Sequence, residues 1–191
     1  MEVRYFDNSA TTRIKEAVLT EMFPFLSREY GNPSSLYSIG RKSKRAIEEA
    51  RKRVASLINC NPEEIYFTSC GSESDNTALK GIAYANSNKG KHIITSKIEH
   101  PAILHSCQNL EKKGFEVTYL DVDKDGFVNL QTLENSIRQD TILISVMFAN
   151  NEIGTIEPIQ EIAKIAHKNG IIFHTDAVQA CGNIPLDVLK M

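Results

Sequence analysis

The chain has few cysteines and no long apolar run. Its four cysteines are far apart, without a Cys-x-x-Cys pair, which argues against a zinc site and a disulfide framework and predicts reduced thiols. No apolar stretch is long enough to cross a bilayer. Residues 2–7 form a charged, strand-like segment and not a signal peptide. We therefore expect a cytoplasmic protein with no membrane partner.

A strong net charge is also missing. The formal net charge of the 191 residues is -2 and the sequence pI is about 6.2. Nucleic-acid binding normally needs a basic stripe. One basic cluster, in residues 41–53, is interleaved with glutamates and predicts a solvated helix face. We expect no nucleic-acid partner and one domain, or a large domain lacking its neighbour.

Helical and strand-like segments alternate along the chain. Hydrophobic periodicity predicts helices at residues 15–26, 40–58, 72–86, 101–113, 132–138 and 159–168. Strand-like runs lie at residues 65–68, 92–95, 115–119, 141–146 and 171–173. This alternation indicates an α/β fold with a mostly parallel sheet flanked by helices.

Polar residues follow the last predicted strand at the place where open α/β sheets bind ligands. Asp176 and Gln179 are three residues apart, close enough to approach one small planar ligand. A carboxylate there can hold a protonated pyridine nitrogen, as a pyridoxal phosphate (PLP) site requires. The alternative is that Asp176 caps the segment of residues 177–181.

Two helix starts offer further candidate contacts. At the first, the backbone amides of Gly71 and Ser72 can bind an anion, although a plain N-cap is the alternative and Glu73 in the first turn disfavours an anion. At the second, His100 precedes Pro101, a favourable first helical residue. His100 can stack on an aromatic cofactor and move protons near neutral pH, or simply cap the helix.

Two loops need a choice between function and turn chemistry. Asparagines after a strand, such as Asn150 and Asn151, often serve the turn alone; alternatively, Asn151 contacts a PLP hydroxyl or a substrate carboxylate. Residues 121–126 copy the start of a calcium-binding EF-hand loop. Position twelve is Thr132 and a strand precedes the segment, so we expect a turn with solvated acids and no metal.

Six motifs occur in order along the chain, at residues 5–12, 31–36, 68–76, 99–102, 150–154 and 175–179. Together they resemble the NifS/IscS-type cysteine desulfurases, which are PLP-dependent members of the class V aminotransferase family. The resemblance covers essentially the whole chain, but the family chain is about twice as long. It implies the large domain of PLP-dependent transferase fold type I, incomplete, at residues 15–191, after an N-terminal arm at residues 1–14.

The resemblance also implies roles for individual residues. His100 would be catalytic, stacking on the PLP ring and taking part in proton transfers. Asp176 would pair with the pyridine nitrogen and Gln179 with the ring hydroxyl. The remaining implied contacts are the phosphate for Gly71 and Ser72, the ring hydroxyl and substrate carboxylate for Asn151, and the substrate entrance and dimer interface for Asn32.

The implied reaction converts L-cysteine to L-alanine and leaves the sulfur as a persulfide on an enzyme cysteine. The family's Schiff-base lysine lies in a Ser-x-His-Lys segment beyond the motif at residues 175–179, and its nucleophilic cysteine lies further on. Neither segment occurs here, and Lys190 stands in a different context. We therefore expect an N-terminal half, truncated before the lysine and inactive alone.

Such a half would leave apolar surface exposed and promote oligomerisation. The expected partners are a second copy in a homodimer and a sulfur-acceptor or iron–sulfur scaffold protein. Two alternatives stay open: a non-catalytic PLP-fold remnant that serves binding or dimerisation, and another class V enzyme such as a selenocysteine lyase.

Overall fold

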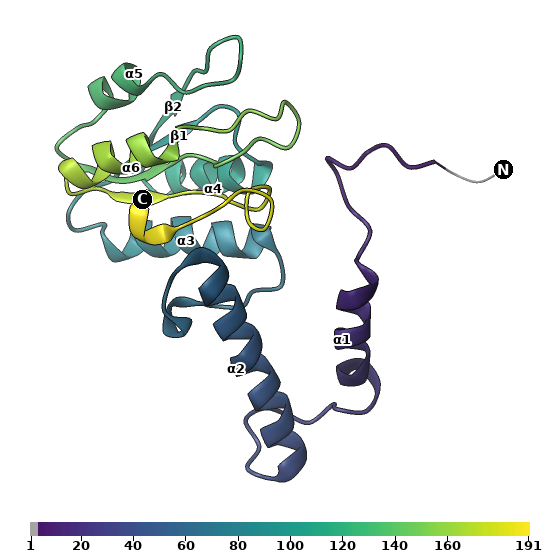
Figure 1. Cartoon of the computed structure of the whole chain (residues 1–191). Helices are drawn as coiled ribbons and strands as arrows, with labels where there is room; N and C mark the ends of the chain where they lie inside the picture. Colours follow the sequence, from purple (N-terminus) through teal and green to yellow (C-terminus); the bar gives the residue numbers. More distant parts are fainter. Residues whose placement is uncertain (1–3) are drawn as a thin grey trace. The chain divides into compact units, whose positions relative to one another are not determined.

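The computed structural model describes residues 4–191 (Figure 1). Internal contacts divide the chain into two compact units, Met1–Tyr66 and Phe67–Met191. Residues 4–7 form no strand, and residues 2 and 3 of the predicted strand-like segment lie outside the described residues. The predicted division into an arm at residues 1–14 and a large domain at residues 15–191 stays a prediction. Within residues 4–191, no helix is long and apolar enough to span a membrane.

In residues 4–66, the described part of the first unit, the helices are α1 (Glu16–Ser27), α2 (Ser38–Ile58) and the short 3-10 helix η1 (Pro62–Glu64). Both predicted α-helices are confirmed. α2 ends where Asn59 adopts a left-handed conformation with φ of 59°, which lets the Cys60 N–H reach the Ala55 carbonyl at 3.0 Å. A left-handed residue is a common way to end a helix, and asparagine tolerates it.

The strand predicted at residues 65–68 is wrong. These residues form no strand, and the Ile65 carbonyl accepts a hydrogen bond from the Arg51 side chain. The Tyr66 side chain is 84% exposed. The segment has the composition of a strand, but no neighbouring strand within the described chain pairs with it.

Large apolar side chains are exposed in the first unit. Phe6 is 85% exposed and Leu36 is 89% exposed, and no residue of α1 is buried. Exposed apolar surface of this kind is typical of a face that packs against other protein. The exposure agrees with the expectation for an incomplete domain, and the oligomerisation stays a prediction.

The second unit is built on a four-stranded parallel sheet with the order β2-β1-β3-β4. Its strands are β1 (His92–Ser96), β2 (Glu116–Leu120), β3 (Thr141–Ser145) and β4 (Ile172–His174). β1 and β3 are central, and both are buried along their whole length. A strand covered on both faces can be a near-continuous apolar run, as residues 142–144 are in β3.

Helices cover both faces of this sheet (Figure 1). They are α3 (Gly71–Ala85), α4 (Pro101–Glu111), α5 (Leu130–Asn135) and α6 (Ile159–Lys168), and η2 (Val188–Lys190) follows near the C-terminus. Side chains alternate along a strand, so Ile93 packs with α3 and α4 in one core cluster, and Ile94 packs with α5 and α6 in another. The predicted α/β class is confirmed.

Element bounds shift where capping decides them. α5 spans Leu130–Asn135 instead of residues 132–138, because the Asn129 side chain caps the helix by accepting from the Thr132 N–H at 2.9 Å. The connection from β1 leads outward to β2 and the next returns to β3. The carboxyl ends of β1 and β3 therefore flank the point where the connections diverge, the usual ligand crevice of such sheets.

Candidate active site

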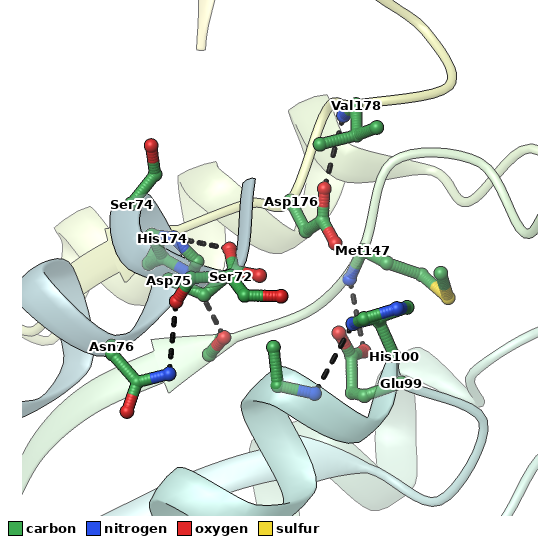
Figure 2. A network of polar contacts seen from close by, with 12 residues as sticks. Ser72, Ser74, Asp75, Asn76, Glu99, His100, Met147, His174, Asp176 and Val178 are labelled. Atoms are coloured by element: carbon green, nitrogen blue, oxygen red, sulfur yellow. Dashed lines mark hydrogen bonds and ion pairs between the residues drawn. The ribbon is translucent and has the colours of Figure 1, made fainter. Parts of the chain in front are cut away.

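Polar side chains from several elements gather at the carboxyl edge of the sheet (Figure 2). Figure 2 shows Ser72 at the start of α3, His100 at the start of α4 and Asp176 after β4. These three predicted site residues all belong to the second unit. The structure thus brings together residues that are far apart in the sequence.

Asp176 joins the extension of β4 to that of β3. Its backbone carbonyl accepts from the Phe148 N–H at 2.8 Å, and its Oδ1 accepts from the Val178 N–H at 3.0 Å. Capping of the following turn, the alternative to a functional role, is therefore observed. This cap uses one of the two carboxylate oxygens of Asp176, whose side chain is half-buried. Gln179 lies in the same turn and is exposed.

A half-buried histidine and a buried aspartate accompany Asp176. His174 Nδ1 lies 2.9 Å from the Ser145 hydroxyl, and His174 Nε2 lies 4.0 Å from Asp75 Oδ1. Burial lowers the pKa of His174 to about 4, so the ring is neutral at pH 7. Burial, and then the charge of Asp176, raise the pKa of Asp75 to about 6. The two aspartates make this edge attractive to a cationic group.

Sequence reasoning missed Asp75 and His174 as members of the site. A signal was present, because Asp75 lies four residues before Leu79 and eight before Ala83, both buried, on the face of α3 that packs on the sheet. His174 is two residues before Asp176, a spacing that aligns side chains on one side of a strand.

The residues predicted to contact an anion lie at the start of α3. Its N-cap is Cys70, followed by Gly71 and Ser72. The backbone amides of Glu73 and Ser72, with the Ser69 hydroxyl, lower the pKa of the exposed Cys70 thiol. The Glu73 carboxylate turns back and accepts from both the Ser69 N–H and hydroxyl at 2.6 Å. Its charge therefore lies before the helix, bound to Ser69.

The two glycines of α3 give a matched test of this helix start. A Cβ at Gly71 would lie 3.0 Å from Val178 Cγ2, whereas a Cβ at Gly81 would meet nothing within 4 Å. We expect Gly81→Ala to stabilise the chain by about 0.5–1 kcal/mol. Gly71→Ala is expected to give less stabilisation, or a loss, because Val178 must move. Urea unfolding measures both, and equal stabilisation would contradict the close packing at Gly71.

His100 caps α4. Its Nδ1 accepts from the Ala102 N–H at 3.1 Å, so in the neutral ring the proton lies on Nε2. The ring is otherwise exposed at the sheet edge. The capping alternative is thus observed, and it leaves the ring face and Nε2 available to a ligand.

Asn150 serves the turn that follows β3. Its Oδ1 accepts from the N–H groups of Glu152 at 2.8 Å and Ile153 at 3.1 Å, while its Nδ2 donates to the Ile98 carbonyl at 3.0 Å. Asn151 is half-buried directly beside it. The turn interpretation holds for Asn150, and the ligand contact of Asn151 stays a prediction.

Two other predicted features form hydrogen bonds within turns. Asn32 belongs to the first unit, where its Oδ1 accepts from the Ser34 N–H at 2.9 Å. In the EF-hand-like segment, Asp123 Oδ1 accepts from the Asp125 and Phe127 N–H groups at 2.9 and 3.0 Å, which makes it a turn. Residues 4–191 contain no group of three or more side chains able to hold a metal ion.

Sequence comparisons find relatives of known name. A cysteine desulfurase IscS of Methanosarcina thermophila is 61% identical over 187 residues, which are 98% of this chain and 46% of that protein. One from Clostridium botulinum (strain Kyoto / Type A2) is 60% identical over 98% of this chain and 47% of that protein. This chain spans about half the length of the curated relatives it matches.

Solved structures agree with the sequence relatives. A NifS-like protein superposes with a TM-score of 0.93 at 44% identity, over 96% of this chain and 51% of that chain. The structure of SspA in complex with cysteine superposes with a TM-score of 0.95 at 40% identity, over 98% and 54%.

Both sets of relatives confirm the predicted resemblance and the fold type I assignment. A sequence model of the family described as Aminotransferase class-V matches residues 4–191. The match includes the helix starts and strand ends that form the carboxyl-edge site. This chain belongs to the class V aminotransferase family.

Proposed function

We propose that this chain provides the cofactor-binding part of a PLP-dependent cysteine desulfurase that acts on L-cysteine. The observation that carries the proposal is the half-buried carboxylate of Asp176 after β4, next to buried Asp75 and across the edge from His100. Relatives named cysteine desulfurase, at about 60% identity, support the choice of reaction.

The residues present fit PLP chemically. Ser72 and the first amides of α3 suit a phosphate, since a helix N-terminus favours an anion, and Gly71 keeps the approach to Val178 open. Asp176 suits a protonated ring nitrogen. The His100 ring is exposed at the same edge and suits stacking. The phosphate group of PLP would compete with the Cys70 thiol for the backbone amides of Ser72 and Glu73, which the thiol contacts.

Bound PLP supplies an electron sink for a carbanion next to the substrate nitrogen. Asp176 holds the proton on the ring nitrogen, which is what makes the ring an effective sink. His100 stacks on the ring and moves protons through Nε2, because Nδ1 is engaged by Ala102. Gln179 and Asn151 bind the ring hydroxyl, and Asn151 also binds the substrate carboxylate. The substrate-entrance role that the resemblance implies for Asn32 stays a prediction.

The proposal also covers turnover, cellular location and protein partners. The family's lysine and nucleophilic cysteine segments are not among these 191 residues, so we expect no turnover by the chain alone. We place the protein in the cytoplasm as a homodimer that passes sulfur to an acceptor or iron–sulfur scaffold protein. The large apolar side chains exposed in the first unit are consistent with burial against further protein.

Complementation in trans tests the proposal. The chain is incubated with PLP and L-cysteine, alone and with the second half of the Methanosarcina thermophila relative, and alanine and sulfide are measured. We expect products only with both halves, and none when Asp176 is replaced by asparagine. L-selenocysteine as the strongly preferred substrate would indicate a selenocysteine lyase. PLP binding without turnover in any combination would indicate a non-catalytic module.

A further inference from the structure

The Glu99 side chain joins the ends of two neighbouring strands. Its Oε1 accepts hydrogen bonds from the Ser96 hydroxyl at 2.6 Å and from the Met147 N–H at 2.9 Å. Ser96 is the last residue of β1, and Met147 lies just beyond the end of β3. One carboxyl oxygen therefore bridges the two strands that flank the ligand crevice.

The other oxygen of Glu99 is buried without a partner among the described residues, and the residue is 4% exposed. An ionised carboxylate in that position would lack both water and a cation. Burial is the main cause that raises the pKa of Glu99 to about 8. The hydrogen bonds from Ser96 and Met147 oppose this shift. Glu99 is therefore a neutral acid at pH 7.

The titratable groups that face Glu99 come from three other elements. Asp176 after β4 and Glu157 before α6 both raise the pKa of Glu99 through their charges. Cys107 on α4 is buried with a pKa raised to about 12, first by burial and then by Glu99. These groups carry no positive charge, so none of them compensates an ionised Glu99.

The Glu99 bridge fixes two segments that carry proposed site residues. On one side, His100 is the next residue and caps the start of α4 (Figure 2). On the other side, Met147 leads into the turn of Asn150 and Asn151, which is tied to the β1 side again by the Asn150 bond to the Ile98 carbonyl. Movement at Glu99 would displace both segments.

We propose that Glu99 is a positioning residue whose neutral side chain holds His100 and the segment leading to Asn151 in a fixed relation. Its consequence for the cofactor rests on the proposed function, whereas the bridge itself does not. Glutamine has the same shape and retains Oε1, so Glu99→Gln keeps the bridge and cannot ionise. Glu99→Ala removes the bridge.

Three measurements on both variants test this inference. Hydrogen exchange at the Met147 amide at pH 7 is expected to be about tenfold faster in Glu99→Ala and unchanged in Glu99→Gln. Urea unfolding between pH 4.5 and 9 is expected to show the parent chain losing stability as the pH rises. The pKa of Glu99 is raised from 4.5 to about 8 in the folded chain, so the stability that this carboxyl contributes is fully present below pH 4.5 and is lost by about pH 8. Glu99→Gln is expected to lack this loss. Equilibrium dialysis with PLP is expected to show weaker binding for Glu99→Ala and recovery in Glu99→Gln.

Two results would overturn the inference. One is unchanged exchange at Met147 in Glu99→Ala, and the other is a loss of stability with rising pH in Glu99→Gln equal to that of the parent. If Glu99→Ala does not fold, the Glu99→Gln comparison over pH decides. If exchange and stability behave as expected but no form binds PLP, the positioning role stands and the proposed function fails.

Discussion

Asp176→Asn is expected to lower the affinity of the chain for PLP by roughly 10- to 150-fold. A hydrogen bond to a charged group contributes about 1.5–3 kcal/mol, and each 1.4 kcal/mol corresponds to about tenfold in affinity. Asparagine keeps the size of the side chain and an acceptor for Val178, but it cannot offer a charge to a pyridinium nitrogen. Equilibrium dialysis with PLP measures the difference.

Asp121→Asn is the matched control for this substitution. Asp121 follows β2 at the same edge of the sheet, is exposed, and pairs with Lys97 at 2.5 Å. Its replacement is expected to leave PLP affinity unchanged. Equal losses in the two variants would show that general edge charge, and not Asp176, holds the ring, and an unchanged affinity in Asp176→Asn would remove Asp176 from the site.

His174→Asn is expected to change the pH dependence of stability by about 3 kcal/mol between pH 6.5 and pH 4. The folded pKa of His174 is lowered from 6.5 to about 4, and each pH unit corresponds to about 1.4 kcal/mol. A basic group whose pKa is lowered on folding contributes its full stability to the folded chain above its unfolded pKa. This stability is lost as the pH falls, because the unfolded chain takes up the proton first. His174→Asn is expected to lack this loss of stability at acid pH.

Urea unfolding at several pH values measures this effect, and the slopes with pH are compared instead of the absolute stabilities. Asparagine can keep a partner for the Ser145 hydroxyl, while Asp75, whose pKa is also shifted, is present in both proteins. His167→Asn, at the exposed end of α6, controls for loss of an imidazole. Identical pH slopes in the parent and His174→Asn would contradict a neutral His174 ring with a lowered pKa.

The central strand β3 could be predicted because burial on both faces leaves a simple apolar pattern. Ile142, Leu143 and Ile144 form such a run in β3. Ile65 and Tyr66 have the same β-rich character, yet they form no strand, since pairing depends on a neighbour that local sequence does not reveal. Helix bounds shifted by a few residues wherever a cap such as Asn129 decided the start.

Some residues of the candidate site could be predicted from the sequence and others could not. Asp176 and His100 could be proposed from sequence because each follows a recognisable strand and lies in an ordered motif. Glu99 and Asp75 were not identified as contributors because their chemistry comes from burial. Each is 4% exposed, and burial is the main cause of the raised pKa values. Burial of this kind follows from tertiary packing and not from spacing.

The most direct test of the central claim is mass spectrometry of the chain mixed with PLP, before and after borohydride reduction. The account predicts one PLP per chain in the native spectrum, held without a covalent bond, and no adduct on the denatured chain after reduction. Either no saturable PLP binding or a stoichiometric adduct at one lysine, such as Lys190, would contradict it. The first result would remove the cofactor site, and the second would show that these residues complete it themselves.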